Sequence, residues 1–240
     1  MRIDAKGLHF SALDRAVREA QEREIIIENC IGQRYIACGL ADKSVTIEGT
    51  PGNALGAYLN GSVISVRGNV QEATGDTMNG GEIVVYGSAG DATGYAMRGG
   101  KIFIREDVGY RCGIHMKAYR ENKPSIVIGG RAGSFLGEYQ AGGTIVVLGD
   151  NLQGKPLIGN FCGTGMHGGE MYLRCERIPT RLPVQVKAER LVKLPEGEAA
   201  QLVREWCKKF GKDSDGYLHS TYYKLTPDSA NPYKQMYTAN

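Results

Sequence analysis

The chain has 240 residues, of which 34 are glycine and only 8 are proline. Hydrophobic residues make up 42% of the chain and charged residues 23%, which is the balance of a soluble globular protein rather than a disordered one. The glycines do not recur at every third position, which excludes collagen. The net charge of +3 is spread along the chain, so neither nucleic acid nor an anionic membrane is expected as a partner.

The sequence shows no sign of export or of a membrane segment. The first residues lack the apolar core of a signal peptide, and the six cysteines form no C-x-x-C pair. The longest stretch without a charged residue runs from Gly49 to Val66 and contains four glycines and a proline, which a membrane helix does not tolerate. We therefore expect a cytoplasmic protein with reduced thiols.

Residues 1–48 are predicted to form a helix and the first strands. Apolar residues recur at helical spacing from Ser11 to Glu24, and Ser11 and Asp14 are arranged as a capping box. The β-branched residues from Ile25 to Ile27 then predict a strand. We expect the helix to cover the open end of the structure that follows, because the end turns of a repeat protein need a cap.

Residues 49–175 form a repeat that is marked by columns of glycine. The main column has steps of 19 residues at first and of 24 and 26 at the end: Gly56, Gly75, Gly94, Gly113, Gly137 and Gly163. A second column lies four residues earlier, and Gly-Gly pairs recur five or six residues later. Glycine suits sharp corners that need a positive φ, and positions where two backbones approach closely.

Each repeat ends in a short apolar stretch that is rich in β-forming residues. These stretches begin at Val45, Val63, Ile83, Ile102, Ile126, Ile145 and Met171. One strand per repeat of about 19 residues predicts a mainly β fold, a single-stranded β-helix or β-solenoid of about seven turns. The extra residues of the longer repeats, Ile114 to Pro124 and Leu148 to Gly159, are expected to leave the stack as loops that contact partners.

Residues 176–240 contain few glycines and are predicted to form a helix followed by a tail. Apolar residues lie on one helical stripe from Glu198 to Phe210, and Gly211 follows as a stop signal. The segment from Tyr217 to Asn240 has five tyrosines and little periodicity, so we expect it to lie along a surface of this chain or of a partner.

Several residues could carry chemistry, but their spacing favours structural roles. Gly163, Gly165 and Gly168 match the G-x-G-x-x-G pattern of dinucleotide-binding loops, yet a strand follows instead of the required helix. The cysteines lack the local pairs of metal and iron–sulfur sites, and Cys162, with His167 nearby, is the one candidate for reactivity. We therefore assign no catalytic, cofactor-binding or metal-binding residue.

One group of basic residues surrounds a histidine in the longer repeat between Gly113 and Pro124. His115 is accompanied by four cations: Arg111, Lys117, Arg120 and Lys123. Such a cluster either meets an acidic partner surface or belongs to a solvated loop.

The glycine columns resemble those of the GXGXG domain family. That family is the right-handed β-helix at the C-terminal end of the large subunit of glutamate synthase, and a version occurs in one of the subunits of formylmethanofuran dehydrogenase. The segment from Gly32 to Ile36 resembles the start of the glutamate synthase version, in particular the form encoded as a separate short chain. The resemblance covers residues 1 to about 175, and the tail segments Lys224 to Pro227 and Pro232-Tyr233 are similar to the same form.

This resemblance implies a non-catalytic scaffold subunit of a split glutamate synthase. In that family an amidotransferase domain releases ammonia from glutamine, and a domain that holds FMN and an iron–sulfur cluster uses it. The expected partners are therefore an amidotransferase subunit and an FMN-domain subunit, with FMN and the cluster outside this chain, and a homo-oligomer is a further option. Arg2 stands where that amidotransferase has its cysteine nucleophile.

Two other functions remain open. One is a scaffold subunit of a complex that resembles formylmethanofuran dehydrogenase. The other is a stand-alone β-helical carbohydrate-active protein, which would need carboxylates clustered on adjacent turns. The repeat strands offer only scattered carboxylates, such as Glu82.

Overall fold

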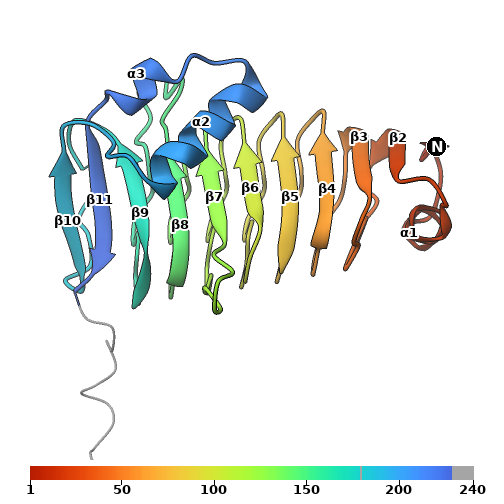
Figure 1. The fold of residues 1–240 in the computed structure, drawn as a ribbon, viewed down its shortest axis with the longest axis horizontal. Helices are drawn as coiled ribbons and strands as arrows, with labels where there is room; N and C mark the ends of the chain where they lie inside the picture. The colour runs from red at the N-terminus through yellow and green to blue at the C-terminus, as the bar shows by residue number, and fades with distance from the viewer. Residues whose placement is uncertain (179, 229–240) are drawn as a thin grey trace, which may run out of the picture.

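The computed structural model describes residues 1–178 and 180–228, and it joins eleven strands into one sheet (Figure 1). The strand order is β1-β2-β3-β4-β5-β6-β7-β8-β9-β11-β10. Neighbouring strands are parallel from β1 to β9, whereas β11 is antiparallel to both of its neighbours. The protein is thus mainly strand, with one large and mostly parallel sheet. No helix of the described residues is long and apolar enough to cross a bilayer.

The strands of the repeat region lie where the apolar stretches predict them. The strands are β1 (Arg2–Asp4), β2 (Glu24–Ile31), β3 (Ser44–Thr50), β4 (Asn60–Val66), β5 (Gly80–Val85), β6 (Lys101–Ile104), β7 (Ser125–Ile128), β8 (Ala141–Val147), β9 (Gly168–Arg174), β10 (Val186–Leu191) and β11 (Tyr222–Pro227). The helices are α1 (Phe10–Glu19), α2 (Glu198–Phe210) and α3 (Asp215–Leu218). The seven predicted stretches are β3 to β9, and the predicted strand at Ile25 to Ile27 belongs to β2.

Equivalent residues of successive repeats are paired in register along the sheet. Ile83 lies opposite Ile102, which lies opposite Ile126, and all three are fully buried. A second row of parallel bridges runs beside the sheet through Val70, Ala89, Val108, Ala132 and Ile158. Each repeat that ends in β5 to β9 therefore adds one strand to the sheet and one residue to this second row, and the core lies between them.

The glycines serve both of the predicted purposes. Gly94 has a φ of +70°, and a Cβ added there would lie 2.5 Å from Cδ1 of Ile126. Gly109 belongs to the second column, where a Cβ would overlap the carboxylate of Asp91. That carboxylate comes from the preceding turn and accepts the backbone N–H of Tyr110 at 2.8 Å. Both the corners and the close backbone approaches thus require glycine, which has no side chain.

The helix α1 covers the N-terminal end of the core with buried Leu13 and Val17, as predicted. Its bounds and its cap differ from the prediction. It ends at Glu19, and the N-cap is His9, whose ring nitrogen Nδ1 accepts the N–H of Ser11. The predicted capping box is therefore wrong, because the helix begins before Ser11.

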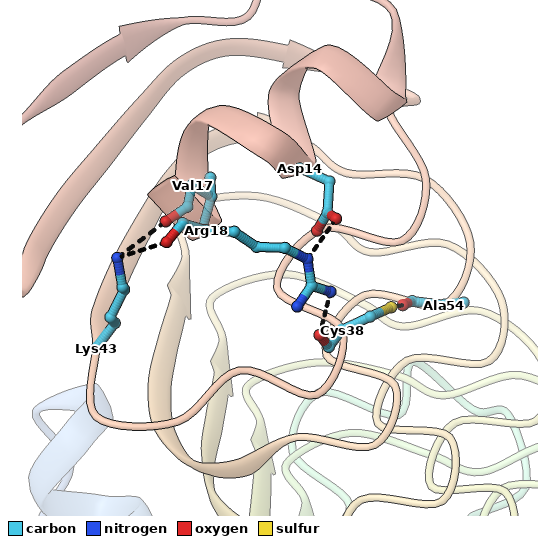
Figure 2. A network of polar contacts seen from close by, with 6 residues as sticks. All are labelled: Asp14, Val17, Arg18, Cys38, Lys43 and Ala54. Carbon is cyan, nitrogen blue, oxygen red and sulfur yellow. Dashed lines mark hydrogen bonds and ion pairs between the residues drawn. The ribbon is translucent and has the colours of Figure 1, made fainter. Parts of the chain in front are cut away.

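A polar network joins α1 to the segment between β2 and β3 (Figure 2). The carboxylate of Asp14 binds the Nε of Arg18 at 2.7 Å, and the guanidinium also donates to the carbonyl of Cys38. Lys43 donates from Nζ to the carbonyl of Val17 at 3.1 Å and to that of Ala20. A cation at the carbonyl end of a helix is stabilising, so Lys43 acts as a C-terminal cap.

The helix α2 has the predicted bounds and covers the outer face of the sheet over its later strands (Figure 1). Gly211 ends it with a φ of +66°. Trp206 is fully buried against this face, and its indole N–H donates to the carbonyl of Ile104 at 2.8 Å. The ammonium of Lys209 binds the carboxylate of Glu82 at 2.7 Å, so this carboxylate from the repeat anchors the helix.

The segment after α2 is not a surface tail, and that prediction is wrong for the described residues. It forms α3 and then β11, which lies between β9 and β10. Tyr222 and Leu225 are fully buried, one on each side of the sheet. The physical reason is that β9 ends the parallel series with an unpaired edge, which β11 satisfies with backbone hydrogen bonds. The Pro232-Tyr233 part of the prediction lies outside the described residues.

Candidate functional site

The cysteines are buried or half-buried thiols and none forms a disulfide. Cys162 is fully buried and its Sγ faces the sulfur of Met171 at 3.9 Å. Burial raises the pKa of the Cys112 and Cys162 thiols to about 12. A thiol with so high a pKa is a poor nucleophile at neutral pH, so Cys162 belongs to the core. No group of three or more histidine, cysteine or acidic residues converges on a metal site within the described residues.

The G-x-G-x-x-G match is part of the repeat. Gly163 and Gly165 have φ values of +72° and +69°, and Gly168 begins the strand β9. A Cβ at Gly165 would overlap the ring of Tyr139 from the preceding turn. Because β9 follows directly, the motif lacks the helix N-terminus on which a dinucleotide phosphate rests.

The structure divides the predicted basic cluster around His115. Arg111 binds the carboxylate of Glu138 at 2.9 Å, and Lys123 lies 3.8 Å from the carboxylate of Glu198. Arg120 lies over the ring of its neighbour Tyr119. The residues Tyr119 and Asn122 form a small hairpin, as expected for a loop that leaves the stack. Of the predicted cluster, His115 and Lys117 remain together on the surface of the stack.

Aromatic residues stack across the corners of the later turns in two rows. In the first row the ring of Tyr110 contacts that of Phe135 at 5.2 Å, and Phe135 contacts Phe161 at 4.8 Å. In the second row His115 lies between Tyr95 at 6.0 Å and Tyr139 at 5.1 Å, and the rings of His115 and Tyr139 are nearly parallel. Phe135 and Phe161 occupy equivalent positions of successive repeats, as do His115 and Tyr139, whereas Tyr110 and Tyr95 join the rows from one position before the equivalent residue.

Many of these rings are exposed, and several stand on strained backbone. Tyr95 is 40% exposed and Phe161 is 55% exposed. His115, Phe135 and Phe161 have φ values of +56°, +61° and +62°. The same positive φ recurs at the equivalent corners of other repeats, for example at Ala92 and Arg111, so it belongs to the geometry of the repeat. The corners therefore present a surface of large, exposed and conformationally fixed rings.

Beside the second row lies a cleft of about 370 Å³, which we call the basic groove. Its polar and aromatic lining consists of Tyr95, Arg98, His115, Lys117, Tyr139 and His167. A smaller cleft of about 330 Å³ shares Arg98 and Lys117 and extends the groove toward Asn79, Tyr119 and Asn122. Among the described residues no acidic side chain lines either cleft, so the groove presents net positive charge.

Residues Asp150 to Lys155, the middle of the second predicted loop, border a larger cleft of about 590 Å³ near the end of α2. Here the carboxylates of Glu106, Asp107 and Asp150 offset three of the four cations that line the cleft. The carboxylate of Asp150 accepts from Arg174 at 3.1 Å and from the hydroxyl of Tyr217 at 2.6 Å. The loop is thus held against the C-terminal segment.

Arg98 is the functional candidate that the sequence prediction missed. It lies one repeat of 19 residues before Lys117, and the repeat places the two side chains on adjacent turns. The 19-residue spacing that defines the glycine columns also relates Arg98 to Lys117, so it could have identified Arg98. The run of nearby basic residues instead favoured Arg120, which lies over the ring of Tyr119, and Lys123, which lies near the carboxylate of Glu198.

The amino-acid sequence matches the GXGXG motif family over residues 12–227. The chain belongs to the GXGXG motif family. The match extends through β11, well beyond the end of the repeat. Membership thus includes the C-terminal segment as well as the repeat.

Two proteins show what this GXGXG chain is similar to. An uncharacterized protein of Methanocaldococcus jannaschii is 45% identical over 249 residues, which cover 98% of this chain and 95% of the relative. A chain in the crystal structure of the formyltransferase/hydrolase complex FhcABCD of Methylorubrum extorquens, determined with methylofuran, has a TM-score of 0.65 and 20% identity. That alignment covers 93% of this chain and 89% of the other, and it shows a shared fold.

Proposed function

We propose that this GXGXG protein is a non-catalytic scaffold subunit of a multi-protein enzyme complex. The carrying observation is the pair of exposed aromatic rows beside the basic groove. Aromatic side chains are enriched where proteins bind one another, because they bring large apolar area with few rotatable bonds. The fold neighbour supports the proposal, since it belongs to a complex of several proteins.

The proposal also includes the fold, which we infer to be a right-handed β-solenoid. The parallel register of β2 to β9 and the second row of bridges support a right-handed β-solenoid with one strand per turn. A stack of this kind is rigid and elongated, and its corners carry side chains in rows. These properties suit a subunit that holds others in place.

Two assemblies are candidates for the complex, and each has its own support. The likeness to a chain of the formyltransferase/hydrolase complex favours a scaffold in a complex that resembles formylmethanofuran dehydrogenase. The segment from Gly32 to Ile36, which resembles the short-chain form of the glutamate synthase domain, favours a split glutamate synthase. In that assembly the amidotransferase, FMN and iron–sulfur chemistry would reside in the partner subunits.

Purification of the tagged chain from its own host, followed by mass spectrometry, tests the proposal. Recovery of an amidotransferase subunit and a flavin subunit in stoichiometric amounts would support glutamate synthase. Recovery of formyltransferase or hydrolase subunits would support the second assembly. A chain that elutes alone or only as a homo-oligomer at physiological concentration would contradict the scaffold function.

A further inference from the structure

The basic groove contains two cations that no carboxylate among the described residues neutralises. Arg98 is half-buried, and it donates a hydrogen bond to the neutral carbonyl of His115 at 3.4 Å. Within residues 1–178 and 180–228, no carboxylate lies within 4.0 Å of the charged groups of Arg98 or Lys117. By contrast, Arg111 and Lys123 each face a carboxylate within this chain. Arg98 and Lys117 are therefore available to an external acid.

The shape of the groove favours an elongated ligand. Its lining includes the residues at one equivalent position of five successive repeats, namely Asn79, Arg98, Lys117, Ala141 and His167. Adjacent strands are about 4.8 Å apart, so four such steps span roughly 19 Å. A single small anion would occupy only the part between Arg98 and Lys117. A peptide of about six extended residues matches the full length at roughly 3.3 Å per residue.

The walls of the groove favour a peptide that carries apolar side chains as well as acids. The rings of His115 and Tyr139 stack at 5.1 Å along one side, and Tyr119 is 57% exposed at the other end. Such rings offer faces for apolar and aromatic contacts. We propose that the basic groove binds an acidic segment of a partner protein, in which carboxylates meet Arg98 and Lys117.

This proposal rests on the proposed scaffold function and names the chemistry of one of its contacts. Opposite charges at such a site guide association and fix the register of the two partners. Reversing the two groove charges would place like charges against the acidic segment. We expect the double variant Arg98→Glu/Lys117→Glu to bind its catalytic partner at least about tenfold more weakly, a loss of about 1.4 kcal/mol.

The test measures the affinity of the full chain for the partner subunits recovered with it from the host. The matched control is Lys6→Glu/Lys193→Glu, which changes the net charge by the same amount at exposed positions outside the groove. Circular dichroism and the fluorescence of Trp206 establish that each variant is folded. The control should bind within about twofold of the wild type, and equal weakening by both variants would overturn the proposal.

A photo-crosslinking residue in place of Tyr139 identifies what lies in the groove. The expected crosslink is to a partner segment with several aspartates or glutamates. A crosslink to a neutral or basic segment, to nucleic acid, or to a second copy of this chain would overturn the proposal. If the wild type recovers no catalytic subunit, the scaffold function itself fails. If it recovers one and the groove variant binds equally well, only the groove assignment fails.

Discussion

Gly94 provides a sharp test of how the corners of the stack are built. The substitution Gly94→Ala forces an L residue to adopt a φ of +70° and places a Cβ 2.5 Å from Cδ1 of Ile126. The left-handed conformation costs about 1–2 kcal/mol, and overpacking a dense core costs about 1–3 kcal/mol. We expect the free energy of unfolding to fall by about 2–5 kcal/mol.

Two further variants separate the two costs. Gly39 has a φ of +62°, and no atom lies within 4 Å of a Cβ added there, so Gly39→Ala should cost only the conformational part, about 1–2 kcal/mol. Ile126→Val removes the Cδ1 that a methyl group at position 94 would meet, at its own cost of about 0.5–1.5 kcal/mol. The double variant Gly94→Ala/Ile126→Val should therefore lose at least about 1 kcal/mol less than the sum of the single losses.

Urea unfolding measures these differences. The signals are the far-ultraviolet circular dichroism of the strands and the fluorescence of Trp206, which is the single tryptophan of the chain. Equal losses for Gly39→Ala and Gly94→Ala would refute the steric part of the reasoning. So would a double variant whose loss equals the sum within about 0.5 kcal/mol, which is the usual error of additivity for independent sites.

Three other predictions concern the helix, the thiols and the cofactors. Trp206→Phe should lower the free energy of unfolding by about 1–3 kcal/mol, because the buried hydrogen bond to Ile104 is lost. Thermal unfolding followed by circular dichroism measures this loss. The exposed control Lys123→Ala should cost under about 0.5 kcal/mol. At pH 8 the native thiols should react slowly with Ellman's reagent, because burial raises the pKa of Cys112 and Cys162 to about 12 and little thiolate is present. Fast reaction of all six thiols before denaturation would contradict this. The purified chain should carry no flavin or iron, and a flavin absorbance band that persists through gel filtration would count against the scaffold assignment.

The repeat, and the helix α2 that covers its later strands, can be predicted from the amino-acid sequence alone. Residues at equivalent positions of successive repeats share the same environment, so Ile83, Ile102 and Ile126 had to pair once they formed strands. On each strand, the residue after the buried isoleucine or valine faces outward. This outward residue is polar on β3 and β4, at Thr46 and Ser65, and apolar on β5 and β6, at Val84 and Phe103. That change predicts a cover over the later strands, and the apolar stripe of α2 supplies it. These features depend on periodicity, which a linear sequence displays.

The place of β11 and the composition of the basic groove depend instead on the folded arrangement. The antiparallel return of β11 depends on which sheet edge is left unpaired after β9, and no local pattern encodes that edge. Whether a cation is paired depends on which carboxylate the fold brings near it. Arg111 forms an ion pair with Glu138, whereas Arg98 and Lys117 have no carboxylate partner among the described residues. Ion pairs and edge pairing join residues far apart in sequence, so their outcome is settled by three-dimensional proximity rather than by spacing along the chain.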